Sequence, residues 1–227
     1  MEKIVIYDLI NNEYNSSKLP DRYNASNYNS YGNFMLKHMK LVNRLVYLNK
    51  LLEEQYLIWL TLINEPRIDK SSDIALVQSI LKHKEWQNLL TNNNFKQEEL
   101  IMHLRKAVDE CVVLLSIATD CFIENNKNVT KRPFESVGEI INQIDRIKLL
   151  KPHKDFLMTI NDISNGFKHC VANSVNGKIG KLEPGIFIYT NEKDKRENYC
   201  EIGITINNLV VEFNKFYFTI DSIIKNG

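Results

Sequence analysis

The sequence predicts a mostly α-helical protein, a helical bundle of four to six helices with a β-hairpin before the C-terminal helix. Apolar residues recur at helical spacing over long stretches, and only 8 Gly and 5 Pro interrupt the 227 residues. Within residues 185–206 the apolar period shortens to about two, which is typical of strands. At roughly 150 residues per domain, the length fits one domain with an elaboration.

The first part of the chain divides into an arm and a long helix. We expect residues 1–34 to form an N-terminal arm with a short strand, because Asn, Tyr and Ser crowd its second half. Residues 35–227 then form a single helical domain that includes the hairpin 185–206. Its first helix begins near Phe34 and ends at the breaker Glu65-Pro66.

The next two helices are predicted on either side of an asparagine run. Ser71-Ser72-Asp73 has the composition of an N-cap, so a second helix is expected to begin there. Three consecutive asparagines at 92–94 are expected to end it. A third long helix then extends from Phe95 to about Ile123, where Asn125-Asn126 follows.

Three further helices and the hairpin complete the chain. Ser136 is expected to cap a short helix whose apolar positions continue to Ile147, and Pro152 marks the start of the next helix. Two strands follow, joined by a charged stretch, over residues 185–190 and 199–206. The last helix bears apolar residues up to Ile224 and ends at the C-terminal glycine.

Composition excludes several classes of protein. A net charge of +1 gives no global field that would attract nucleic acid or an acidic membrane, so any nucleic-acid contact is local. The apolar stretches fall short of a membrane span, and the first residues do not resemble a signal peptide. We therefore expect a cytoplasmic protein without membrane contact.

Cofactor and metal chemistry have no support in the sequence. The four cysteines stand far apart without a C-x-x-C pair, so they are expected to be reduced and not metal-bound. No Gly-rich phosphate loop or dinucleotide fingerprint is present. We expect no cofactor, and we expect surface positions for the scattered residues His38, His83 and His153.

Polar residues gather beside a strongly apolar helix face in only one stretch, 161–169. Asn161, Asn165 and His169 stand four residues apart and therefore line one side of the helix, with Lys168 close to them. An imidazole can take a proton from a ribose 2′-hydroxyl and return one to the leaving oxygen, while Lys and Asn can hold a phosphate. Such groups suffice for a metal-independent ribonuclease.

The stretch Ser164-Asn165-Gly166-Phe167-Lys168-His169 resembles the signature of the HEPN superfamily of all-helical domains. That signature is an Arg, a polar residue and, a few residues later, a His. Asn165 and His169 match, whereas Ser164 replaces the Arg, and Lys168 lies on the neighbouring flank of the helix. The resemblance implies RNA or nucleotide binding in a bacterial toxin–antitoxin or antiphage system, with RNA cleaved across a homodimer cleft.

On that resemblance the candidate catalytic residues are Ser164, Asn165, Lys168 and His169. Asn161 and Lys178 are candidate substrate-binding residues. The missing Arg favours an alternative from another class, a non-catalytic antitoxin, immunity or regulatory protein whose bundle and hairpin bind another protein. In that case Asn165 and Lys168 simply solvate a helix face. A third alternative is a ligand pocket between bundle and hairpin.

Two further expectations concern the long helices. Glu110, on the same side as His103, could orient His169 or pair with Arg146, but a surface glutamate whose stem covers apolar neighbours is the favoured interpretation. The helices also carry more apolar surface than a small monomer needs, which favours a homodimer. An exposed Trp59 or Trp86 would then anchor the interface.

Overall fold

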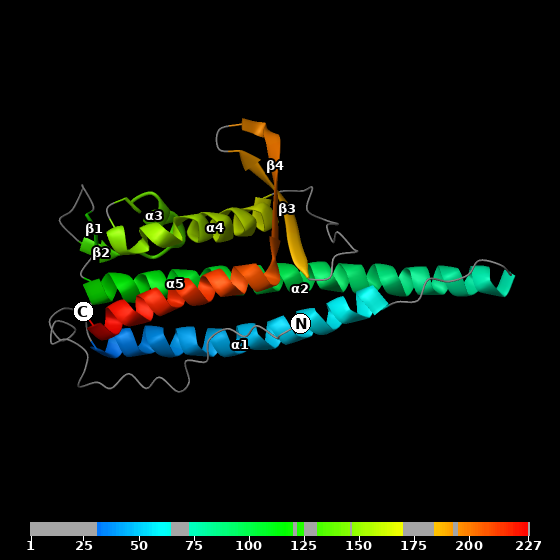
Figure 1. Ribbon diagram of the computed structural model, residues 1–227, viewed down its shortest axis with the longest axis horizontal. Coiled ribbons are helices and arrows are strands. Elements are labelled where there is room, and N and C mark those ends of the chain that lie inside the picture. The colour runs from blue at the N-terminus through cyan, green and yellow to red at the C-terminus, as the bar shows by residue number, and fades with distance from the viewer. Residues whose placement is uncertain are drawn as a thin grey trace.

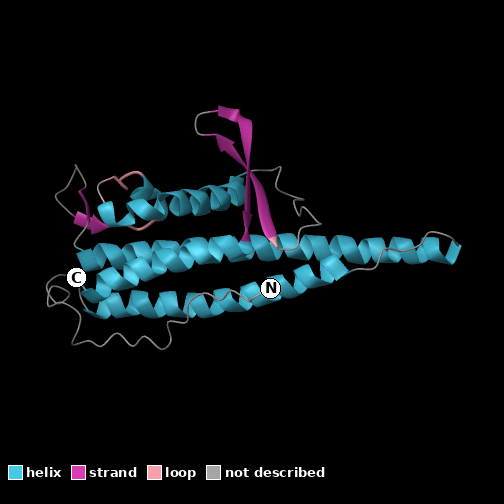
Figure 2. Cartoon of the chain, in the orientation of Figure 1, coloured by secondary structure: helices cyan, strands magenta, loops and turns pink. Residues whose placement is uncertain are grey.

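The computed structural model describes residues 31–64, 73–119, 122–124, 131–145, 147–169, 184–192 and 195–226. Most of these residues are helical, and an antiparallel hairpin directly precedes the last helix, as predicted (Figure 2). The strand expected near the N-terminus lies outside this part of the chain. The elements are α1 (Tyr31–Asn64), α2 (Asp73–Thr119), β1 (Phe122–Glu124), β2 (Lys131–Pro133), α3 (Val137–Ile141), the 3-10 helix η3 (Lys148–His153), α4 (Lys154–His169), β3 (Gly185–Glu192), β4 (Lys195–Thr205) and α5 (Ile206–Asn226).

The longest helix, α2, is the centre of the arrangement. Figure 1 shows α1, α2 and α5 side by side along one axis, with α3 and α4 on the opposite side of α2 from α1. The β3–β4 hairpin stands across α2, and the first part of α2 extends beyond the other helices. Because α2 contacts α1, α3, α4 and α5, its faces determine where the other helices lie.

One apolar core joins these helices. It comprises residues of α1, α2, α4 and α5 together with the segment around α3, and its largest fully buried side chains include Phe34, Phe134, Phe213 and Phe216. The apolar face predicted for α4 is confirmed, since Ile160 and Ile163 are fully buried and Phe167 packs partly buried against the core. Among the described helices, none has a segment apolar and long enough to cross a bilayer.

The first helix ends where predicted but begins earlier, at Tyr31, so that Phe34 belongs to the core and not to an arm. The predicted break at residues 92–94 is wrong. Asp73–Thr119 is one continuous helix. Asn93 lies 1% exposed between helices, where its Oδ1 accepts a hydrogen bond from Gln55 Nε2 of α1 at 2.5 Å. Each asparagine costs a helix only some tenths of a kcal/mol, roughly 0.7 at most, so packing and this bond outweigh three of them.

The end of α2 and the extent of α3 also differ from expectation. The helix ends at Thr119, short of Ile123, because residues 122–124 pair instead with residues 131–133 as an antiparallel ladder. Ser136 caps α3 as predicted, but α3 ends at Ile141. Consecutive turns over 142–145 still bury Ile144, so the apolar spacing that suggested a helix to Ile147 is satisfied without one.

Hydrogen bonds at its base fix the hairpin to the body. Its register pairs Gly185 with Thr205 and continues to Glu192 opposite Lys195, so both strands extend further toward the turn than predicted. The Gly185 carbonyl accepts from Gln97 Nε2 of α2 at 3.1 Å, and Ile206 N donates to Pro184 O at 3.0 Å. The hairpin is therefore anchored where α5 begins.

The Gln55–Asn93 pair gives a test of α2 continuity. Gln55 Oε1 and Asn93 Nδ2 are buried without a hydrogen-bond partner, so the pair is only half satisfied. We expect Asn93→Leu to lower the free energy of unfolding by about 1–3 kcal/mol, because it strands the Gln55 amide. The double variant Gln55→Leu/Asn93→Leu should recover most of that loss in urea unfolding. A double variant less stable than the single one would contradict this.

Candidate functional site

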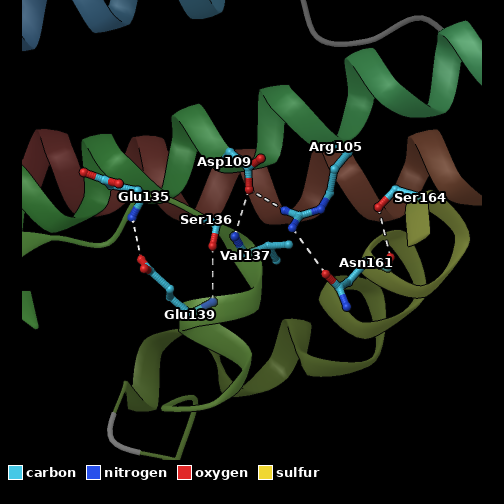
Figure 3. A network of polar contacts seen from close by, with 8 residues as sticks. All are labelled: Arg105, Asp109, Glu135, Ser136, Val137, Glu139, Asn161 and Ser164. Carbon is cyan, nitrogen blue, oxygen red and sulfur yellow. Dashed lines mark hydrogen bonds and ion pairs between the residues drawn. The ribbon is translucent and has the colours of Figure 1, made fainter. Parts of the chain in front are cut away.

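The candidate site lies on the side of α4 that faces α2 and α3. Asn161 is half-buried there, and its Oδ1 accepts a hydrogen bond from Arg105 Nη2 of α2 at 3.2 Å (Figure 3). The same oxygen lies 3.9 Å from the position that a Cβ on Gly138 of α3 would occupy. Asn161 is thus held between two other helices, which fixes where its amide points.

Arg105 is in turn held by Asp109, one helical turn later on α2. The guanidinium donates from Nη1 to the Asp109 carboxylate, which also accepts from the Val137 backbone N–H at 2.8 Å. The same Arg105 leaves its buried Nε without a hydrogen-bond partner. One carboxylate therefore joins α2 to the start of α3, and through Arg105 to α4 (Figure 3).

Burial controls the ionisation of this pair. Desolvation raises the pKa of the Asp109 carboxyl, opposed mainly by the charge of Arg105 and more weakly by that of Lys168. Desolvation also lowers the pKa of Arg105. Lys168 of α4 is exposed, and its positive charge lowers the pKa of Asp109 slightly. Asp162, whose Oδ1 accepts from Asn161 Nδ2 at 3.4 Å, adds a second carboxylate, so the site holds two cations and two anions.

The start of α3 is fixed by a reciprocal cap next to this carboxylate. Ser136 Oγ accepts from Glu139 N at 3.4 Å, and Glu139 Oε2 accepts from Glu135 N at 2.9 Å (Figure 3). These bonds satisfy the amide groups that a helix start leaves unpaired. Together with the bond from Val137 to Asp109, they keep α3 against Asn161.

The residues singled out from the sequence occupy different environments. Ser164 is fully buried, and its hydroxyl donates to the Asn161 carbonyl at 2.9 Å. Asn165 is half-buried and Lys168 is exposed. His169 is the last residue of α4, but its side chain, like all of Lys178, lies outside the described part. The structure thus brings Asn161 and Lys168 to one edge, and it turns Ser164 into the interior.

Sequence reasoning missed Arg105 and Asp109. Their spacing of four residues is that of an ion pair on one helix face. The pair also borders the apolar arc that carries Leu104 and Val108, both buried. A charged pair beside two such residues was the available signal, because charges that border a buried arc have to be paired.

A second polar cluster corrects the expectation for Glu110. Its side chain is 8% exposed and receives both arms of the Arg44 guanidinium, Nε at 2.8 Å and Nη2 at 2.8 Å. Arg44 Nη1 lies 3.1 Å from His103 Nδ1, which must accept because a guanidinium only donates. Glu110 is therefore a buried partner of α1. The cation that pairs with Glu110 is Arg44 of α1, so no pattern within the sequence of α2 could reveal the pair.

This cluster continues along the junction of α1 and α2. The ring of Tyr47 packs on His103 at 4.7 Å, and its hydroxyl donates to Glu99 Oε1 at 2.5 Å. Lys96 then bridges Glu99 and Glu54, at 3.1 and 2.8 Å. The run of alternating charges gives the two helices a fixed register beside their apolar contact.

Other expectations for single residues change as well. His38 is buried and His153 is half-buried with Nε2 2.8 Å from Thr219 Oγ1, so only His83 has the exposed position expected. Trp59 is 3% exposed and cannot anchor an interface, because α1 turns it toward the bundle. Cys111 is buried and forms no disulfide. In the described ranges, no group of His, Cys, Asp and Glu could hold a metal ion.

Comparisons with known proteins add no relative. No family model, curated protein or solved structure matches this chain.

The Arg44–His103 contact predicts a pH dependence of stability. Desolvation, followed by the charge of Arg44, lowers the pKa of His103 from its usual 6.5. As the pH falls through 6.5, His103 is protonated in the unfolded chain before it is protonated in the folded one. The free energy of unfolding therefore decreases on the acid side.

We expect His103→Asn, whose amide oxygen can accept from Arg44, to flatten this acid loss in urea unfolding between about pH 7.5 and pH 5.5. His83→Asn is the matched control, since His83 is exposed. Equal acid loss in the His103 variant and the wild type would contradict the assignment.

Proposed function

We propose that this protein is a HEPN-like RNA- or nucleotide-binding protein of a bacterial toxin–antitoxin or antiphage system, acting in the cytoplasm. One observation carries the proposal: Asn161 and Lys168 are seven residues apart on α4 and so share one side of it, and Arg105 of α2 donates to Asn161. The motif in α4 has Ser164 where the HEPN signature has an Arg. Arg105 brings a cation to the same helix from another element.

The groups at this edge suit a phosphate-bearing ligand. Lys168 is exposed and can approach a phosphate oxygen as a mobile cation. Asn161 lies two turns earlier on the same side of α4; Arg105 occupies its Oδ1 and its Nδ2 donates to Asp162 Oδ1 at 3.4 Å, which leaves one N–H of the amide as a donor. Asp109 pairs with Arg105 and the Asp162 carboxylate lies beside Asn161, so Lys168 is the cation left to attract a phosphate. The affinity for RNA is accordingly modest and depends on salt.

Cleavage, in this proposal, requires His169. A neutral imidazole would accept the proton of a ribose 2′-hydroxyl, whose oxygen attacks the adjacent phosphorus and expels the 5′-oxygen. A protonated imidazole would return a proton to that leaving oxygen, and Lys168 would stabilise the charge on the phosphate. No metal ion takes part in these steps.

A second candidate function is non-catalytic binding of another protein, as an antitoxin, immunity or regulatory subunit. The burial of Ser164 and the closed Arg105–Asp109 pair favour it, because neither side chain is available to a reacting phosphate in this arrangement. The two functions predict different behaviour toward RNA.

Cleavage is tested with transfer RNA in buffer containing a metal chelator. We expect the wild type to cleave it and His169→Ala to lose at least about a hundredfold in rate, the typical contribution of a general base. Cleavage that survives His169→Ala removes the ribonuclease assignment. Binding without cleavage by either protein leaves a degenerate RNA-binding site.

Binding is tested by titrating a labelled single-stranded RNA at several salt concentrations. We expect Lys168→Ala to weaken binding and to reduce the slope of log K against log salt by about 1, since one phosphate contact is lost. Lys84→Ala is the matched control, because Lys84 is an exposed lysine of α2 about six helical turns before Arg105. Equal effects of the two variants would exclude the α4 edge as the RNA site.

A further inference from the structure

The solvent side of α1 carries large apolar side chains that the fold leaves uncovered. Four of them lie along its length, each about half exposed or more: Leu36 at 66%, Met39 at 55%, Val46 at 49% and Leu57 at 57%. The opposite side of the same helix is buried in the core, with residues such as Leu41, Leu45 and Leu48. The helix is therefore apolar on two faces, of which one packs within the chain.

The exposed apolar residues share one heptad frame. Leu36 and Leu57 are 21 residues apart, a multiple of seven, and occupy position a of the heptad. Met39 and Val46 follow Leu36 by three and ten residues and occupy position d. The remaining a and d positions between residues 36 and 60 are Asn43, Lys50, Glu53 and the half-buried Leu60. We define these eight residues as the α1 seam. Five of the eight are apolar, and Asn43, Lys50 and Glu53 are the polar members.

We propose that the α1 seam pairs with the α1 seam of a second copy of this chain, in antiparallel orientation. A parallel pair in register would place Lys50 against Lys50 and Glu53 against Glu53 of the second copy. Like charges in a seam oppose association, so the charges select the antiparallel pair.

The charges also select the register. When Lys50 faces Glu53 of the second copy, the two-fold axis lies between residues 51 and 52. Val46 then faces Leu57 of the second copy, and both contacts occur twice. A shift by one heptad would bring Lys50 against Val46 and Glu53 against Asn43, which leaves both charges without an opposite charge in the seam. The first register opposes Val46 to Leu57 but Asn43 to Leu60, whereas the shifted register opposes Met39 to Leu57 and Leu36 to Leu60, so apolar matching alone does not choose between them. Only the first register opposes cation to anion, so the charges decide.

This interface lies away from the α4 edge. Figure 1 shows α1 and α4 on opposite sides of α2, so pairing through the outer face of α1 leaves the α4 edge of each copy open. The α1 pair is therefore separate from the homodimer cleft that the HEPN resemblance implies at α4, and an RNA-binding protein and a protein-binding one could both assemble through α1.

The test is a charge swap followed by sedimentation velocity. We expect a dimeric wild type, and we expect Lys50→Glu or Glu53→Lys alone to weaken dimerisation roughly tenfold or more, because each creates two like-charge contacts per dimer. The double variant Lys50→Glu/Glu53→Lys restores opposite charges and should restore the dimer. Lys84→Glu, an equal change on exposed α2, is the control and should leave the dimer intact.

Fold and register are checked separately. Circular dichroism of each variant excludes unfolding as the cause, which matters because Lys50 also lies 3.8 Å from Glu54 of its own helix. Val46→Cys/Leu57→Cys should form a disulfide between copies under oxidation; within one helix these positions are about 16 Å apart and cannot join. Met39→Cys/Leu57→Cys, which fits the shifted register, is the control.

Three results would overturn the proposal. The first is a monomeric wild type at high protein concentration. The second is a swapped double variant that stays as weak as the single variants. The third is cross-linking of the control cysteine pair in place of Val46→Cys/Leu57→Cys, which would assign the other register.

Discussion

The half-buried carboxylate of Asp109 is the contact on which the candidate site depends. It accepts the Arg105 guanidinium of its own helix and the first amide of α3, and Arg105 passes the connection to Asn161 of α4. Burial alone would favour the protonated acid, and its pKa is indeed raised. The hydrogen bonds from Arg105 and from the Val137 amide offset the cost of burying the carboxylate. The Arg105–Asp109 ion pair thereby joins α2, α3 and α4.

That arrangement decides what the α4 edge can offer. Arg105 occupies the vicinity of the motif, but Asp109 already balances its charge, so it positions Asn161 and contributes little free charge. Lys168 is the exposed cation of the α4 edge. The net charge of the whole chain, +1, adds little further attraction for an anionic ligand. If RNA is the ligand, the protein holds it by few phosphate contacts. If a protein is the partner, the same closed pair serves as a structural link.

The two faces of α1 carry different information. Its inner face packs against α2 through the apolar core, through the Arg44–Glu110 fork and through the buried Gln55–Asn93 pair. These polar contacts cost desolvation, yet they allow only one register of the two helices. The outer face repeats an apolar spacing in heptads and carries one cation and one anion at its centre. A long helix with both features is suited to an internal partner and an external one.

The sequence by itself determined the helical class, the end of α1, the Ser136 cap, the hairpin and the last helix, because these follow from period, caps and turn residues close together in the chain. The tertiary structure decided the rest. The asparagines at 92–94 predict a break, yet Gln55 of another helix satisfies Asn93 within a continuous α2. Glu110 suggests a surface residue until Arg44 lies opposite, and Asn161 gains its place only through Arg105. In each case a partner more than thirty residues away fixes the environment, and spacing along one helix cannot reveal it.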